Sequence, residues 1–147
     1  YIDLSGVDYI LIDCPPSLGM LTLNALVAAT EILVPIQTEY YALEGVTALL
    51  NTIERVKGNL NDRLKLTNIL LTMYDKRTNL SRDVAAEVRS HFPEETLSIE
   101  IPRSVRIAEA PSFGQTVLTY QPRSDGAAAY VRAAEEIADQ VETKELS

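Results

Sequence analysis

The sequence predicts an α/β fold with a mostly parallel sheet that carries helices on both of its faces. Short apolar runs, typical of buried strands, alternate along the chain with longer segments in which apolar residues recur every three or four positions. This alternation indicates crossover connections, which place successive strands parallel to one another. We therefore expect one domain over residues 1–147, a length that suits a single domain.

Each element is expected from its own pattern. The first strand is a continuous apolar run, which predicts burial on both faces, and Pro35 in the second strand implies a bulge or a sheet edge. The strands are expected at residues 9–12, 32–36, 66–74 and 97–101. The first helix is apolar nearly all round and is therefore expected to be mostly buried. The helices are expected at residues 18–29, 43–58, 80–92 and, with Ser124 as the N-cap, 127–141.

Charge and cysteine content limit the classes of protein that remain. The net charge of −8 argues against a protein that coats nucleic acid with its whole surface. Ten of the thirteen Lys and Arg residues nevertheless lie within residues 55–106, where they form either a local basic face or the solvated side of helices. Cys14 is the single cysteine, which excludes a disulfide framework and indicates a reducing compartment. Cys14 is expected to be a buried structural thiol rather than a nucleophile, because no motif pairs it with His91.

Asp13 is the strongest candidate for a functional carboxylate. Four apolar residues followed by an aspartate at a strand end match the Walker B arrangement, in which the carboxylate holds Mg²⁺ through water beside nucleotide phosphates. Two other interpretations remain open at this point. The aspartate could simply cap the following turn, or it could be the phosphoacceptor of a receiver-type domain. The receiver interpretation lacks the acidic pair that it requires at an earlier strand end.

Further candidates follow the other strands. In open parallel sheets the functional residues lie just beyond the carboxyl ends of the strands. This rule selects residues 37–41, 73–77 and 102–106 in addition to Asp13, and we expect all four groups along one edge of the sheet. Tyr40 and Tyr41 are interpreted as packing residues there, with a subunit interface as the alternative.

Four stretches are informative: DCPPSLG at 13–19, VPIQTEYYALEG at 34–45, LTMYDKRT at 71–78 and IPRSVRIAEAPS at 101–112. They resemble the ParA/Soj-type chromosome-partitioning ATPases, which form the deviant Walker A branch of the P-loop NTPases together with MinD. The stretches keep one order and extend over nearly the whole chain. The resemblance implies a partial P-loop NTPase-like fold, with residues 1–147 as the C-terminal two thirds of the ATPase domain.

One departure from the family concerns the phosphate-binding loop, which in the family is a glycine-rich strand-to-helix turn with two lysines. None of the six glycines in this sequence is followed by Lys-Ser or Lys-Thr. Without the backbone N–H groups and lysines of that loop, little remains to hold the phosphates. We expect these 147 residues alone not to hydrolyse ATP, and an intact parent with the loop to do so.

The resemblance implies roles for residues around the nucleotide. Asp13 would be the catalytic carboxylate on the Mg²⁺ side, and Cys14, Pro15 and Pro16 would form the switch that senses the γ-phosphate. The residues implied to enclose the adenine are Met73 and Asp75 on one side and Pro102 and Arg103 on the other.

The resemblance also implies partners. Arg77 and Arg106 match family positions that bind DNA without sequence specificity in the ATP-bound homodimer. A ParB-type protein would stimulate hydrolysis and release, and the protein would be cytoplasmic and associated with the nucleoid. The acidic tail is unlike the basic membrane helix of MinD-type relatives, so no membrane partner is expected. The alternative function is a non-catalytic, DNA-facing interaction module of the same fold that has lost the nucleotide site.

Overall fold

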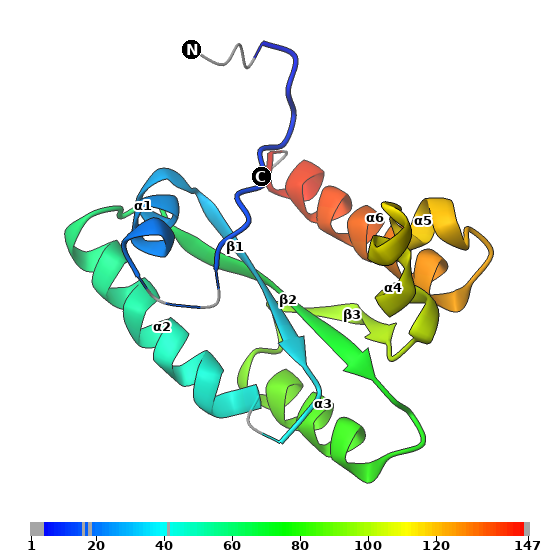
Figure 1. Ribbon diagram of the computed structural model, residues 1–147. Coiled ribbons are helices and arrows are strands. Elements are labelled where there is room, and N and C mark those ends of the chain that lie inside the picture. Colours follow the sequence, from blue (N-terminus) through cyan, green and yellow to red (C-terminus); the bar gives the residue numbers. More distant parts are fainter. Residues whose placement is uncertain (1–4, 16, 18, 41, 146–147) are drawn as a thin grey trace.

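The computed structural model describes residues 5–15, 17, 19–40 and 42–145, which fold around one parallel sheet (Figure 1). The sheet consists of β1 (Glu31–Gln37), β2 (Lys65–Tyr74) and β3 (Thr96–Pro102) in the spatial order β1-β2-β3. Both neighbouring pairs are parallel, so the carboxyl ends of all three strands lie along one edge of the sheet. The predicted α/β fold class is confirmed.

Helices cover both faces of the sheet, as the sequence predicts. Figure 1 shows α2 (Ala42–Asn59) and α3 (Asn79–His91) on one side and α6 (Asp125–Glu145) on the other. Alternate residues of β2 divide between these two layers. Ile69 and Leu71 pack against α2 and α3, whereas Leu70 packs against α6.

The first helix, α1 (Met20–Ala28), is less buried than its composition predicts. Leu26 is buried in a small cluster with residues of α2 and with Leu64, which precedes β2. Met20 and Leu21 are exposed, so the expectation of a mostly buried helix is wrong. A helix that is apolar all round becomes buried only when elements cover its whole circumference, and within the described residues α1 contacts mainly α2.

The largest difference from the predicted fold is at residues 9–12, which do not form a strand. Ile10 and Leu11 are 61% and 88% exposed, although the apolar run predicts a strand that is buried on both faces. An apolar run becomes a buried strand only beside neighbouring strands and under covering helices. None of the elements among the described residues pairs with this segment.

The other expected strands and helices are present near their predicted bounds. β1 lies at the edge of the described sheet, which is one of the two alternatives expected from Pro35. The register shift between β1 and β2 falls at Ile32 and Leu33, whereas Pro35 pairs regularly with Leu70. The Ser124 hydroxyl oxygen accepts a hydrogen bond from the Ala127 N–H at 3.2 Å, as expected of an N-cap. No helix in the described part of the chain is long and apolar enough to cross a membrane.

The connection between β3 and α6 contains short elements that the sequence patterns did not predict. These are α4 (Val105–Glu109), a 3₁₀ helix, η1 (Ala110–Phe113), and α5 (Val117–Tyr120). Gly114 ends the 3₁₀ helix with a φ of 64°, a left-handed conformation that glycine adopts without steric cost. Elements of four or five residues are too short to show a repeating apolar period.

Candidate functional site

The carboxyl ends of β2 and β3 lie side by side, and they bring together four of the predicted site residues. Tyr74 is the register partner of Pro102, and the Arg103 N–H donates to the Tyr74 carbonyl at 2.9 Å. The segments Met73–Asp75 and Pro102–Arg103 are therefore neighbours at one edge of the sheet. Gln37, at the end of β1, pairs with Thr72 at the same edge.

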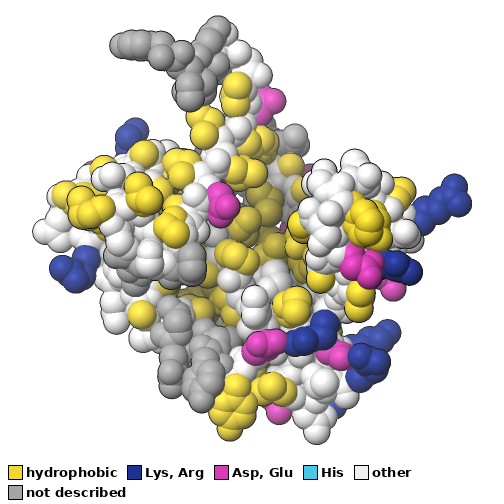
Figure 2. All heavy atoms as spheres, viewed as in Figure 1, with side chains coloured by type: hydrophobic (Ala, Val, Ile, Leu, Met, Phe, Trp, Pro, Cys, Tyr) yellow, Lys and Arg dark blue, Asp and Glu magenta, His cyan; other side chains and the backbone are white. Residues whose placement is uncertain are grey.

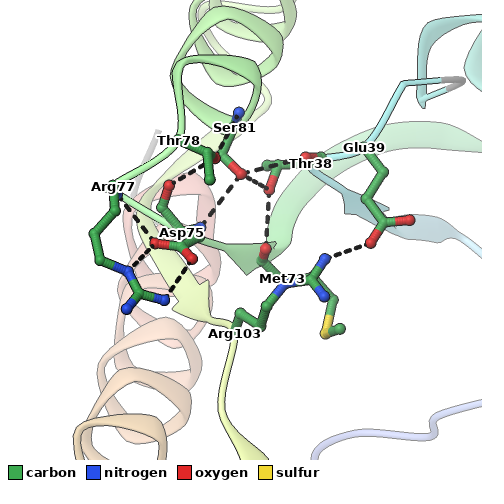
Figure 3. Close-up of polar contacts among 8 residues, drawn as sticks. All are labelled: Thr38, Glu39, Met73, Asp75, Arg77, Thr78, Ser81 and Arg103. Atoms are coloured by element: carbon green, nitrogen blue, oxygen red, sulfur yellow. Dashed lines mark hydrogen bonds and ion pairs between the residues drawn. The ribbon is translucent and has the colours of Figure 1, made fainter.

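Two buried hydroxyl groups tie the end of β1 to the end of β2 and to the start of α3 (Figure 3). The Thr38 and Ser81 hydroxyl oxygens are 3.2 Å apart. The Thr38 hydroxyl also lies 3.2 Å from the Met73 carbonyl, and the Ser81 hydroxyl oxygen accepts from the Asp75 N–H at 3.3 Å. The two hydroxyl groups thus contact the backbone at Met73, near the end of strand β2, and at Asp75, which follows the strand.

Met73 has an unusual backbone conformation. Its φ of 54° is the one positive value among the described non-glycine residues. A side chain with a Cβ atom disfavours this left-handed region, which is why such residues are concentrated at functional sites. The sequence carries no signal for it, because methionine is an ordinary residue in a strand.

Asp75 holds Arg77 in a two-pronged ion pair. The Arg77 Nε donates to Asp75 Oδ1 at 2.9 Å and the Arg77 Nη2 donates to Asp75 Oδ2 at 2.8 Å. The Arg77 backbone N–H also donates to Asp75 Oδ1, at 3.0 Å. The hydrogen bonds from the Arg77 side chain and backbone, in that order, hold the pKa of the Asp75 carboxyl well below its usual range. Two residues predicted for different ligands, nucleotide and DNA, are therefore in direct contact.

The other predicted basic residues of this edge are also paired with carboxylates. The Arg103 Nη2 lies 2.5 Å from Glu39 Oε1, an ion pair that bridges the ends of β1 and β3. The Arg106 Nη1 lies 3.3 Å from Glu109 Oε2 within α4. Both pairs are exposed, so they orient the guanidinium groups more than they stabilise the fold.

The segment that carries Asp13 lies apart from these contacts. Asp13 is exposed and does not follow a strand, so the predicted strand-end position is not found. Pro15 is tied to α1, because its carbonyl lies 3.4 Å from the Thr22 hydroxyl, which also donates to the Ser17 carbonyl at 2.7 Å. Pro16, the third member of the implied switch, is outside the described residues, as is Tyr41.

Two predictions about side chains near the site are wrong. Cys14 is exposed rather than buried, with its thiol 3.6 Å from the Ile12 carbonyl oxygen, because residues 9–12 do not enter the sheet that would have buried it. Tyr40, in the turn beyond β1, is 81% exposed, which contradicts the packing interpretation, whereas the subunit interface stays a prediction.

The face of the sheet opposite α2 and α3 is hollowed near β1. Figure 2 shows apolar side chains gathered in a hollow between the part of the molecule around α1 and the part formed by α4 to α6. Leu33 of β1 alternates with the buried Val34 and is 42% exposed. Within the described residues, no group of three or more His, Cys, Asp or Glu side chains could by itself hold a metal ion.

Sequence reasoning missed Ser81 as a member of this edge. Thr38 and Glu39 lie within residues 37–41, which the strand-end rule selects, but the sequence patterns assign neither residue a role of its own. Ser81 lies in the first turn of α3, and only the fold shows that this turn lies beneath the end of β1.

Comparison with known proteins gives a consistent assignment. Residues 4–66 match the family model described as an AAA domain. The chain is 56% identical over 137 residues to the chromosome-partitioning ATPase Soj of Thermus thermophilus, covering 93% of this chain and 55% of that protein. It is 53% identical over 129 residues to the chromosome partitioning protein ParA of Caulobacter vibrioides, covering 88% of this chain and 48% of that protein.

Solved structures show the same fold. Cobyrinic acid a,c-diamide synthase from Mycobacterium smegmatis, with bound ADP and magnesium, is 38% identical with a TM-score of 0.70, covering 90% of this chain and 46% of that one. The cell division ATPase MinD of Pyrococcus furiosus is 27% identical with a TM-score of 0.72, covering 90% of this chain and 52% of that one. The chain spans about half the length of the curated relatives that it matches. Over most of its length the chain is therefore similar to the Soj/ParA chromosome-partitioning ATPases, and it corresponds in length to about half of such a protein.

Proposed function

We propose that this chain is part of an ATP-dependent DNA-segregation ATPase, in which the carboxyl edge of the sheet contributes to both nucleotide and DNA binding. The observation that carries the proposal is the contact between the ends of β2 and β3, where the Arg103 N–H donates to the Tyr74 carbonyl at 2.9 Å. This contact places Met73 and Asp75 beside Pro102 and Arg103. The similarity to Soj and ParA supports the same assignment.

The residues of this edge suit the base of a nucleotide. Met73 and Pro102 are both half-buried, so each offers an apolar surface that a purine ring could cover. Arg103 is held in place by Glu39, which orients its guanidinium at the rim. The sequence has no glycine followed by Lys-Ser or Lys-Thr that would mark a phosphate-binding loop, so we assign the phosphates to the part of a full-length relative that this chain does not span.

A magnesium ion at Asp13 would need the nucleotide phosphates to supply further ligands. Mg²⁺ commonly uses one or two protein carboxylates and completes its shell with phosphate oxygens and water. Asp13 is an exposed carboxylate and can supply the first of these ligands. When bound, the ion would neutralise charge on the phosphate oxygens during transfer to water.

Arg77 and Arg106 are the proposed contacts to DNA phosphates. The Arg77 side chain is 82% exposed, and Asp75 occupies only the Nε and one Nη2 hydrogen, so the remaining N–H groups of the guanidinium face solvent. Such contacts bind all sequences alike, because they engage phosphates rather than base edges. In an ATP-bound dimer each arginine would be present twice. Hydrolysis stimulated by a ParB-type partner would then separate the two subunits and release the DNA.

The test is ATP hydrolysis by the full-length protein and its Asp13→Asn variant. We expect the wild type to hydrolyse Mg–ATP and Asp13→Asn to lose this activity. Asp8→Asn, which neutralises another exposed carboxylate of the same segment, should retain it. Wild-type turnover by Asp13→Asn would refute the assigned role. A full-length protein that binds DNA but no nucleotide would instead be the non-catalytic module.

A further inference from the structure

Thr38 and Ser81 form a buried hydroxyl pair beside the end of β2 (Figure 3). Their relative exposures are 2% and 4%, so water cannot replace the hydrogen bonds that they make. The two residues come from different elements, Thr38 from the end of β1 and Ser81 from the first turn of α3. Buried polar groups with several internal partners fix the geometry of the groups that they contact.

The hydroxyl pair contacts the Met73–Asp75 segment, in which Met73 and Tyr74 end β2 and Asp75 follows it. The Thr38 hydroxyl lies 3.3 Å from the Thr72 carbonyl oxygen and 3.2 Å from the Met73 carbonyl oxygen. The Ser81 hydroxyl donates to the Thr38 carbonyl at 3.3 Å and accepts from the Asp75 N–H at 3.3 Å. The Thr38 hydroxyl has one proton to donate to the carbonyls of Thr72 and Met73, and the Ser81 oxygen accepts from the Asp75 N–H, so the same pair contacts this segment at both of its ends.

The segment needs such support because of its conformation. The left-handed φ of 54° at Met73 is unfavourable for a residue with a side chain, so the segment would relax if its tethers were removed. Relaxation would move the Met73 side chain and the Asp75 carboxylate together. It would leave the earlier part of β2 intact, because Ile69 and Leu71, which precede Met73 in the strand, are fully buried.

We propose that Thr38 and Ser81 are positioning residues that hold Met73 and Asp75 in place as one wall of the site for the nucleotide base. The proposal rests on the proposed function, because it requires that a base bind at this edge. Neither hydroxyl touches the nucleotide. They hold Met73 and Asp75 in the binding conformation before the base binds, which increases the affinity for the nucleotide without adding contacts to it.

The test compares two ligands that share phosphates and differ in the base. Thr38→Val and Ser81→Ala are made in the full-length protein, and the Kd of each variant is measured for Mg–ATP and for Mg–tripolyphosphate. We expect affinity for Mg–ATP to fall about tenfold in each variant, with tripolyphosphate affinity unchanged within about twofold. KM for ATP should rise while kcat changes little, because the base wall is remote from the bond that breaks.

Matched controls remove hydroxyl groups that lie elsewhere. Thr52→Val and Ser90→Ala delete exposed hydroxyls of α2 and α3, which donate to Ala48 and Glu87 carbonyls, and they should leave both affinities unchanged. Thr38→Ser retains the hydroxyl and should restore binding of Mg–ATP. Urea unfolding checks that the variants are folded; if Thr38→Val does not fold, Ser81→Ala decides the outcome.

The outcomes separate this inference from the function on which it rests. Unchanged ATP affinity in both variants, or an equal loss for the two ligands, would overturn the positioning role while leaving the ATPase proposal intact. A wild-type protein that binds tripolyphosphate as tightly as ATP would show that no base wall exists and would overturn both.

Discussion

Reversing the charge of Arg77 is the most direct test of the proposed DNA surface. In Arg77→Glu, the new carboxylate would lie beside the Asp75 carboxylate, which now accepts two hydrogen bonds from the arginine side chain at 2.9 and 2.8 Å. The guanidinium that could contact a phosphate is removed, and two negative charges remain in its place. We expect weaker binding to every DNA sequence by the ATP-bound full-length dimer.

The size of the effect follows from counterion release. Each phosphate contact contributes about 0.9 to the slope of log K against log salt, and a dimer with two copies of Arg77 would lose about 1.8. At a salt concentration of about 0.1 M, one contact strengthens binding about eightfold relative to about 1 M, so two contacts amount to about sixtyfold. Asp75→Asn should act in the opposite direction, because it removes the negative charge that partly offsets Arg77.

The assay is fluorescence anisotropy of a labelled duplex, titrated with protein at saturating Mg–ATP and at four or more salt concentrations. Arg63→Glu is the control, since it makes the same charge change at an exposed residue before β2, at the amino end of the strands. Arg63→Glu should keep the wild-type salt slope.

The reasoning would be refuted if the Arg77→Glu dimer formed normally and bound DNA with wild-type affinity and slope. Equal losses in Arg77→Glu and Arg63→Glu would also refute it, because they would show an effect of net charge rather than of a local contact.

The remaining predictions concern stability and nucleotide binding. Asn61→Ala should lower the free energy of unfolding by about 2 kcal/mol in urea titrations, because the buried amide donates to the Leu26, Val27 and Ala29 carbonyls at 3.0, 3.1 and 2.7 Å. Asn59→Ala, which removes one exposed hydrogen bond, should cost less than about 0.5 kcal/mol. Since Arg77 lowers the pKa of Asp75, the folded state gains stability above the ordinary carboxyl pKa of about 3.9 and loses it as the pH falls further. The difference in urea midpoint between wild type and Asp75→Asn should therefore disappear on acidification. Residues 1–147 alone should show no heat of binding with Mg–ATP, and a micromolar affinity, about 8 kcal/mol, would require another phosphate cradle.

Much of the fold could be predicted because its signals are local and periodic. Val84 and Val88 of α3 recur at helical spacing and are both buried, and Ile69 and Leu71 alternate with Leu70 across the sheet. Gln37, Asp75 and Pro102 lie along one edge, as the rule for carboxyl ends of parallel strands predicts, whereas Asp13 does not follow a strand.

The failures have a common physical cause, which is that burial depends on partners that a sequence pattern does not reveal. Ile10 and Leu11 form a strand-like run, and yet no described element lies beside them. The apolar period also carries no information about hydroxyl groups, so Thr38 and Ser81 could not be paired before the fold was known. Their contact joins residues 43 positions apart in the chain.

In the described sheet, Pro35 changes the hydrogen-bond donors that the free side of β1 presents to another strand. The Thr38 N–H donates to Thr72 of β2, and because strand residues alternate in direction, the backbone nitrogen of Pro35 is on the side away from β2. The proline therefore costs the sheet no hydrogen bond and removes one donor from the open edge. A foreign strand that aligned there would find a gap in its ladder, which opposes edge-to-edge aggregation.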